Sequence, residues 1–165
     1  ESRGLGDVYK RQINVLSALE MYNAVIKYSS SADIIIMAAA VADYRPIKAE
    51  TDKIKKSEQT ITINLERTDD ILSAVCKNRK KNQFICGFSM ETENLIENSR
   101  KKLYKKGCDM IAANNLKIEG AGFGTDTNVL TLITKSFEEE LPIMTKEEAA
   151  DRILDEAVKK TGDNQ

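Results

Sequence analysis

The chain has 165 residues, of which 41% are hydrophobic and 31% charged, and its formal net charge is −1. This length allows one domain with a sizeable core and does not require two. The near-neutral charge argues against a broad nucleic-acid or membrane surface, and no apolar run approaches the ~20 residues of a membrane-spanning helix. No signal-peptide pattern opens the chain, so we expect a cytoplasmic globular protein.

The cysteines and the missing histidine limit the possible chemistry. Cys76, Cys86 and Cys108 are odd in number and lack CxxC spacing, which predicts buried thiols in a reducing cytosol. The absence of histidine argues against a zinc site and removes Ser-His and Cys-His nucleophile systems. Chemistry would therefore rest on lysines, carboxylates, backbone amides or a ligand-borne metal, which suits phosphate transfer better than proteolysis.

The amino-terminal part predicts a helix followed by a buried strand. Residues 1–12 show no sustained periodicity, and we interpret them as a non-native leader. Ser17 and Glu20 form a capping box at the start of a helix with an apolar stripe. Residues 33–37 are a β-branched apolar run typical of a buried strand. Three alanines follow, and small side chains at a strand's carboxyl end allow a ligand to approach the backbone closely.

The middle of the chain alternates between predicted strands and helices. A polar loop carries Lys53, Lys55 and Lys56, whose charges suit a polyphosphate, although a solvated loop is the alternative. Residues 60–65 alternate as a half-buried strand. Thr68 can cap the helix that follows. The remaining expected elements are a buried strand at 84–88, a helix from Thr92 to Lys106 stopped by Gly107, and a strand at 109–113.

The carboxyl-terminal part predicts an edge hairpin and a final helix. A glycine loop at 120–124 precedes a β-rich run at 128–134, and residues 138–144 would be its hairpin partner. Thr145 and Glu148 form a second capping box, which opens a helix to about Lys159. The alternation of strands and helices predicts an α/β fold with a mostly parallel sheet and an antiparallel edge pair.

Several sequence blocks in the same order resemble phosphopantothenoylcysteine synthetase, a coenzyme A enzyme that is often fused to a decarboxylase in bacteria. The blocks are AAAVADYRP (38–46), KIKK (53–56), ERTDDIL (66–72), CGFSMETENL (86–95), KKLYKKG (101–107), DMIAANN (109–115) and GAGFGTDTNVLTLI (120–133). The resemblance covers roughly residues 15–158. It implies a Rossmann-like three-layer fold without the family's first strand, with residues 13–165 forming a partial ligase domain.

The resemblance also implies a reaction and its partners. Such a ligase joins 4′-phosphopantothenate to L-cysteine through an acyl-cytidylate intermediate, using CTP with Mg²⁺ and releasing pyrophosphate and CMP. A homodimer is expected, with a decarboxylase fused or assembled in the complete protein, and neither nucleic acid nor membrane as a partner. The strand pair near the carboxyl end is the candidate dimer element. No residue of the protein is assigned as a metal ligand.

Site residues follow from the matching positions. Lys53 would be catalytic by stabilising the charge that develops during transfer. Ala39, Ala40 and Asp43 would bind phosphopantothenate. The nucleotide would contact Ala38, Ala39, Asp43, Lys53, Asp69, Asp70, Ile71, Leu72, Phe88, Lys102 and Lys106. Ordinary structural alternatives remain for several of them: a turn for Asp43, a capped helix start for 68–72, the core for Phe88 and a solvated helix face for the lysine pair.

Two departures from the family pattern bear on activity. Asp69 replaces the usual proline of the family's helix start, and its carboxylate could compete for the amides there. Upstream of Val15, nothing matches the family's first strand, its nucleotide loop or its catalytic asparagine. The alternatives are therefore a non-catalytic nucleotide-binding or interaction module and an NAD(P)-dependent reductase, although the chain lacks a complete GxGxxG fingerprint.

Overall fold

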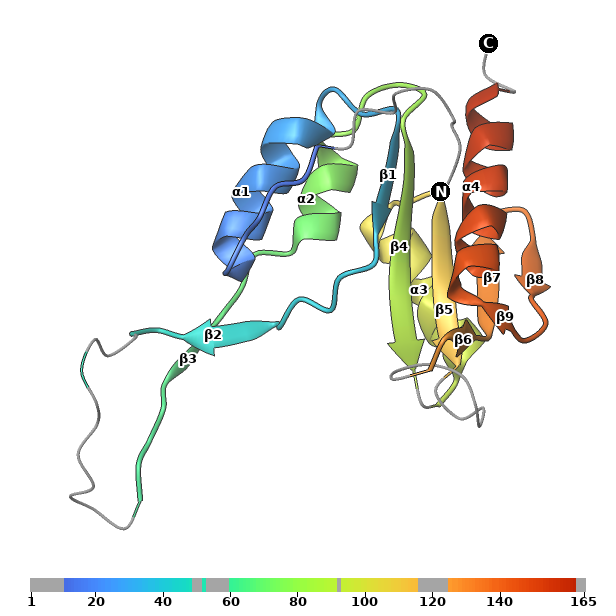
Figure 1. Cartoon of the computed structure of the whole chain (residues 1–165). Helices are drawn as coiled ribbons and strands as arrows, with labels where there is room; N and C mark the ends of the chain where they lie inside the picture. Colours follow the sequence, from blue (N-terminus) through green and yellow to red (C-terminus); the bar gives the residue numbers. More distant parts are fainter. Residues whose placement is uncertain (1–10, 49–51, 53–59, 92, 116–124, 163–165) are drawn as a thin grey trace, which may run out of the picture.

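The computed structural model describes residues 11–48, 52, 60–91, 93–115 and 125–162. A five-stranded sheet with the order β1-β4-β5-β7-β8 forms its centre (Figure 1). The parallel strands are β1 (Ile34–Met37), β4 (Phe84–Glu91) and β5 (Met110–Asn115). The antiparallel strands β7 (Leu130–Thr134) and β8 (Glu138–Glu140) complete the sheet. The predicted parallel sheet with an antiparallel edge pair is confirmed.

Four helices make a three-layer arrangement with this sheet. One face packs against α1 (Ala18–Ser29), α2 (Ile71–Lys77) and α3 (Leu95–Lys106), and the other against α4 (Lys146–Gly162). Alternate residues of each central strand point to opposite faces. Ile85 therefore packs with α2 and α3, whereas Cys86 packs in the cluster that contains α4. None of the helices in the described residues has the length and apolar character needed to cross a bilayer.

Two short antiparallel pairs lie outside the central sheet. The strands β2 (Tyr44–Pro46) and β3 (Leu65–Arg67) form one pair, which projects away from the body of the molecule in Figure 1. The strands β6 (Thr127–Asn128) and β9 (Met144–Thr145) form the other. In β2–β3, Arg45 Nε donates to Glu66 Oε1 at 2.9 Å, and both side chains are exposed.

The predicted capping box at α4 is confirmed, whereas at α1 the predicted cap Ser17 is confirmed but the Glu20 carboxylate bonds to the amide of Leu16 and not to that of Ser17. At α1, Glu20 N donates to Ser17 Oγ at 3.2 Å, and the Glu20 carboxylate accepts from Leu16 N at 2.7 Å. At α4, Glu148 N donates to Thr145 Oγ1 at 3.2 Å, and Thr145 N donates back to Glu148 Oε2 at 2.8 Å. In both helices the cap hydroxyl satisfies an amide that the first helical turn leaves without an intrahelical partner.

Several predicted boundaries are wrong for identifiable reasons. Residues 60–64 are exposed coil, because β2 offers a pairing partner only to Leu65–Arg67. The cap of α2 is Asp70 and not Thr68, because the helix begins at Ile71 and Ser73 N donates to the Asp70 side chain. The helix expected from Thr92 begins at Leu95, after Asn94 in a left-handed conformation. The expected hairpin partner at 138–144 ends at Glu140, and Met144 pairs with β6 instead.

Candidate functional site

A cavity of about 360 Å³ lies beyond the carboxyl ends of β1 and β4, between these strands and the facing parts of α2 and α3. This is the edge at which open α/β sheets bind ligands. Acidic, basic and apolar side chains all contribute to its wall. The described lining residues are Met37, Ala39, Val41, Ala42, Asp43, Tyr44, Arg67, Thr68, Asp69, Asp70, Ile71, Leu72, Phe88, Lys102, Lys105 and Lys106.

Lysines on one face of α3, together with Arg67 of β3, supply the positive charge of this cavity. The Nζ of Lys102 donates to the backbone oxygen of Phe88 at 2.7 Å, which holds the ammonium group beside the carboxyl-terminal half of β4. Lys106, one turn further along α3, forms an ion pair with Asp70. Lys105 also lines the cavity, although it was not predicted from the sequence. Its position three residues after Lys102 could have indicated that it shares the face of Lys102, because residues three and four apart are neighbours on a helix.

Asp70 connects α2 to this lysine face. Its Oδ1 accepts from Ser73 N at 3.0 Å, and its Oδ2 accepts from Ser73 Oγ at 2.9 Å. Partial burial alone would raise the pKa of Asp70, but the hydrogen bonds from Lys106 and Ser73 outweigh it and lower that pKa below its usual value. The carboxylate therefore stays ionised near neutral pH, caps α2 and holds Lys106 at the cavity.

The segment after β1 is hydrogen-bonded to the residues just before α2. Thr68 Oγ1 donates to Ala42 O at 2.5 Å, and Thr68 N donates to Asp43 O at 3.0 Å. These bonds keep Asp43 beside the start of α2, and Asp43 and Asp69 line the same cavity. Thr68 thus acts by joining two walls of the site and not as the helix cap.

A second cavity of about 470 Å³ adjoins the first. The two cavities share lining residues, namely Ala39, Val41, Asp43, Phe88 and Lys102. The second is completed by Ala38, Ala40, Ser89, Met90, Asn114, Asn128 and Lys146. Among the described residues, the Oδ1 of Asn114 is the buried side-chain polar atom without a hydrogen-bond partner. The sequence analysis did not select Asn114 or Lys146, although Asn114 directly follows the apolar run predicted at 109–113.

The predicted site residues in the described part of the chain gather around these two cavities. Asp43, Asp69, Asp70, Phe88, Lys102 and Lys106 line the first, as do Ile71 and Leu72, which also belong to the hydrophobic core. Ala38 and Ala40 line the second, and Ala39 and Asp43 line both. Lys53, Lys55, Lys56 and the glycine loop at 120–124 lie outside the described residues.

A three-layer α/β fold with a lysine-lined cleft at its strand ends defines a Rossmann-like domain with a site suited to an anionic ligand. The chain belongs to the family described as the DNA/pantothenate metabolism flavoprotein C-terminal domain, whose model matches residues 7–161. Family membership agrees with the resemblance found in the sequence blocks.

Known relatives match most of this chain. It is 42% identical over 155 residues to the coenzyme A biosynthesis bifunctional protein CoaBC of Bacillus subtilis (strain 168), a match covering 92% of this chain and 38% of that relative. It is 43% identical over 143 residues to a cysteine/cysteine sulfinic acid decarboxylase of an unknown prokaryotic organism, covering 86% and 40% respectively. The chain therefore spans about two fifths of the length of these curated relatives.

Solved structures share the fold. The crystal structure of the C-terminal domain of CoaBC aligns with a TM-score of 0.73 and 36% identity, over 92% of this chain and 66% of that chain. A Cab2 mutant in complex with phosphopantothenate-cysteine aligns with a TM-score of 0.66 over 88% of this chain and 51% of that one. At 14% identity the second likeness concerns the fold alone.

Proposed function

We propose that this chain is the phosphopantothenate–cysteine ligase domain of a coenzyme A biosynthesis protein. The observation that carries the proposal is the pair of adjoining cavities at the sheet edge, one lined by Lys102, Lys105 and Lys106. Its support from known proteins is the 42% identity to a CoaBC protein and the likeness to the CoaBC C-terminal domain. A lysine-lined cleft suits the triphosphate of a nucleotide. The adjoining cavity suits 4′-phosphopantothenate, the carboxylic acid that the nucleotide would activate.

In the proposed reaction, the first cavity takes CTP and the second takes 4′-phosphopantothenate. The pantothenate carboxylate attacks the α-phosphorus of CTP, and pyrophosphate leaves with the electrons of the broken P–O bond. The amine of L-cysteine then attacks the acyl carbonyl, loses a proton and displaces CMP. Neither step needs a protein nucleophile, which agrees with a sequence without histidine. The protein contributes alignment and neutralisation of phosphate charge.

Residues shared by the two cavities would lie where the carboxylate meets the α-phosphate. Lys102 is one of them, and its bond to Phe88 O fixes its ammonium group between the cavities. Asp43 is another, and its backbone is held by Thr68. Lys106 would approach the triphosphate from the same helix. We further propose Lys53 as the catalytic lysine that stabilises the charge developing during transfer, on the resemblance of the KIKK block.

Mg²⁺ is proposed to arrive with the nucleotide. Within the described ranges, no group of three or more His, Cys, Asp and Glu side chains is arranged to hold a metal ion. Mg²⁺ on a triphosphate needs only one or two protein carboxylates. Asp43 and Asp69 line the first cavity and fit that requirement. When bound, the ion would neutralise phosphate charge, while the residues above orient the substrates.

The experiment that tests the ligase assignment is pyrophosphate release by the complete gene product. We expect release only when CTP and 4′-phosphopantothenate are both present, followed by CMP release when L-cysteine is added. Binding of CTP without any acyl-nucleotide would favour the non-catalytic binding module. Saturable binding of NADPH in place of CTP would favour the reductase. The homodimer, the fused decarboxylase and the cytoplasmic location are also proposals, and sedimentation velocity tests the first of them.

A further inference from the structure

Asn114 on β5 has a buried side chain whose amide oxygen is unpaired. The residue is 9% exposed, and its Oδ1 accepts no hydrogen bond within the described residues. The backbone of Asn114 belongs to the central sheet, where it is paired with Met90 of β4 and Leu130 of β7. An unpaired amide oxygen in a protein interior costs free energy of folding, and folded proteins contain few of them. Folding therefore leaves one acceptor at this position without a donor.

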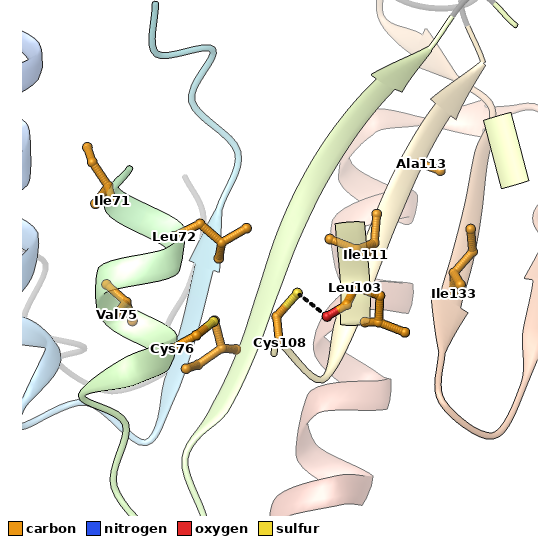
Figure 2. Packing of buried hydrophobic residues seen from close by; sticks show 10 residues of the cluster. Ile71, Leu72, Val75, Cys76, Leu103, Cys108, Ile111, Ala113 and Ile133 are labelled. Carbon is orange, nitrogen blue, oxygen red and sulfur yellow. Dashed lines mark hydrogen bonds between the residues drawn. The ribbon is translucent and has the colours of Figure 1, made fainter. Parts of the chain in front are cut away.

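The side chain of Asn114 lies on the side of the sheet that carries α4. Alternate residues of a strand face opposite sides of a sheet. Figure 2 shows Ala113 of β5 in the buried cluster that also contains residues of α2 and α3. Ala112 packs on the other side, in the cluster that contains α4, and Asn114 follows it by two residues. Asn114 accordingly lines the second cavity together with Lys146, the first residue of α4.

Asn114 lies further along the sheet than the wall that the two cavities share. Phe88 belongs to that shared wall and is paired with Ala112. Asn114 is paired with Met90, two residues beyond Phe88. Two residues of a strand rise about 7 Å. A ligand in the second cavity whose reacting end lies at the shared wall would therefore extend toward Asn114.

The acid substrate of the proposed reaction has a hydrogen-bond donor in the corresponding part of the molecule. The carboxylate of 4′-phosphopantothenate is separated by two methylene groups from an amide N–H. With the carboxylate at the shared wall, this amide lies further into the second cavity. The Cβ–Cγ torsion of asparagine is soft, so Oδ1 can turn toward a donor in the cavity.

We propose that Asn114 is a substrate-recognition residue whose Oδ1 accepts a hydrogen bond from the amide N–H of 4′-phosphopantothenate. This inference rests on the proposed ligase function and assigns a role to a residue outside the positions that the sequence blocks selected. A site with a buried acceptor rejects an analogue that lacks the matching donor, because the acceptor then stays unpaired. Asn114 would therefore select the amide over an analogue in which an ester oxygen replaces the N–H.

The test measures binding of 4′-phosphopantothenate and of this ester analogue to the complete gene product by calorimetry. The titrations contain α,β-methylene CTP, which cannot release pyrophosphate. Asn114→Leu should bind the amide about tenfold more weakly than wild type does, and should bind the amide and the ester equally. Its affinity for the CTP analogue should equal that of wild type, because Asn114 does not line the first cavity.

Asn98→Leu is the matched control. Asn98 Nδ2 donates to Glu91 Oε2 at 3.3 Å and to Glu93 O at 3.1 Å, and Asn98 lines neither cavity. This variant should bind 4′-phosphopantothenate with wild-type affinity and should still prefer the amide to the ester.

Denaturation provides a readout that separates recognition from a structural role. Leucine is close to asparagine in volume and removes the unpaired oxygen, so Asn114→Leu should unfold at a denaturant concentration no lower than wild type. A lower midpoint with unchanged affinity would show a structural role and overturn the inference. Asn114→Ala gives the same binding comparison where the leucine variant does not fold.

The binding results distinguish failure of this inference from failure of the proposed function. Equal affinity of wild type and a folded Asn114 variant for 4′-phosphopantothenate would overturn the role of Asn114 alone. So would an ester analogue that binds wild type as tightly as the amide does. A wild-type protein that does not bind 4′-phosphopantothenate at all would overturn the proposed function, and this inference with it.

Discussion

Lys106 near the end of α3 forms an ion pair with Asp70 at the start of α2. The same carboxylate accepts hydrogen bonds from Ser73 and caps α2. One aspartate therefore fixes both the entry of a helix and the position of a cation at the cavity. Lys102, on the same helix, donates to Phe88 O of β4. The lysine charge of the site is therefore positioned by α3 and by its contacts with β4 and α2.

Replacement of Lys106 by methionine should weaken CTP binding with little effect on stability. A charge-assisted hydrogen bond contributes about 1.5–3 kcal/mol, so we expect a loss of affinity of roughly tenfold to a hundredfold, measured by calorimetry. Lys101→Met is the matched control, because Lys101 is exposed on the same helix and pairs with Glu97. Equal weakening by both variants would indicate a general effect of net charge and contradict a specific role for Lys106.

Two substitutions of Asp70 should separate the contribution of its helix cap to stability from the contribution of its negative charge. Asparagine is also a good N-cap, whereas alanine at this position typically costs about 1 kcal/mol. We therefore expect Asp70→Ala to lower the free energy of unfolding by about that amount, and Asp70→Asn by clearly less, in urea titrations. Equal destabilisation by the two variants would mean that the negative charge, and not the cap, accounts for the contribution.

The contribution of Asp70 should also depend on pH with a defined sign. Its pKa is lower in the folded protein than in the unfolded chain, so folding favours the ionised form. The resulting stability is fully present above the unfolded pKa of about 4 and is lost as the pH falls through the lower folded pKa. The stability difference between wild type and Asp70→Asn should be constant above about pH 5 and shrink below it. A difference that grows on acidification would contradict this assignment.

Gly87 on β4 permits the close approach of α2 to the sheet. A Cβ at this position would lie 2.6 Å from Leu72 Cδ2 and 3.2 Å from Ile111 Cδ1. Gly87→Ala should therefore destabilise the protein by about 1–3 kcal/mol through overpacking. The loss in a Gly87→Ala/Leu72→Ala double variant should be smaller than the sum of the two single losses, because Leu72→Ala removes the methyl group nearest the new atom. Additive losses in the double variant would show that Leu72 is not the source of the clash.

Lys53→Ala in the complete gene product should reduce turnover strongly while leaving the far-ultraviolet circular dichroism unchanged. The expected reduction in kcat is roughly a hundredfold or more, as for the loss of one electrostatic group at a reacting phosphate. Lys77→Ala is a control on the last turn of α2, outside both described cavities. Near-normal turnover by Lys53→Ala would reject the catalytic role.

Local patterns predicted the central strands and two helix starts well. The apolar runs at 84–88 and 109–113 became the core of β4 and β5, and the predicted caps Ser17 and Thr145 both accept from an amide of the helix that follows. The cap of α2 was predicted wrongly as Thr68. The structure has Asp70 in that role, because α2 begins two residues further along and Ser73 N donates to Asp70 Oδ1, whereas the Thr68 hydroxyl makes a tertiary bond to Ala42 O.

Only part of the candidate site could be predicted from the sequence, because the rest depends on tertiary contacts. The lysine pair on α3 and the alanines after β1 were identifiable from matching blocks, and they do lie around adjoining cavities. Asn114 and Lys146 were missed because their position depends on which strands and helices become neighbours. The strand predicted from the alternation at 60–65 was wrong over residues 60–64 for the same reason. A two-residue period produces a strand only where a partner strand is present.

The most direct test of the proposed site is a titration of the protein with CTP and Mg²⁺, compared with a Lys102→Met/Lys106→Met double variant and the Lys101→Met control. We expect saturable binding to wild type and to the control, and at least a tenfold loss of affinity in the double variant. Binding of undiminished affinity by a folded double variant would contradict the assignment of this cavity to the nucleotide.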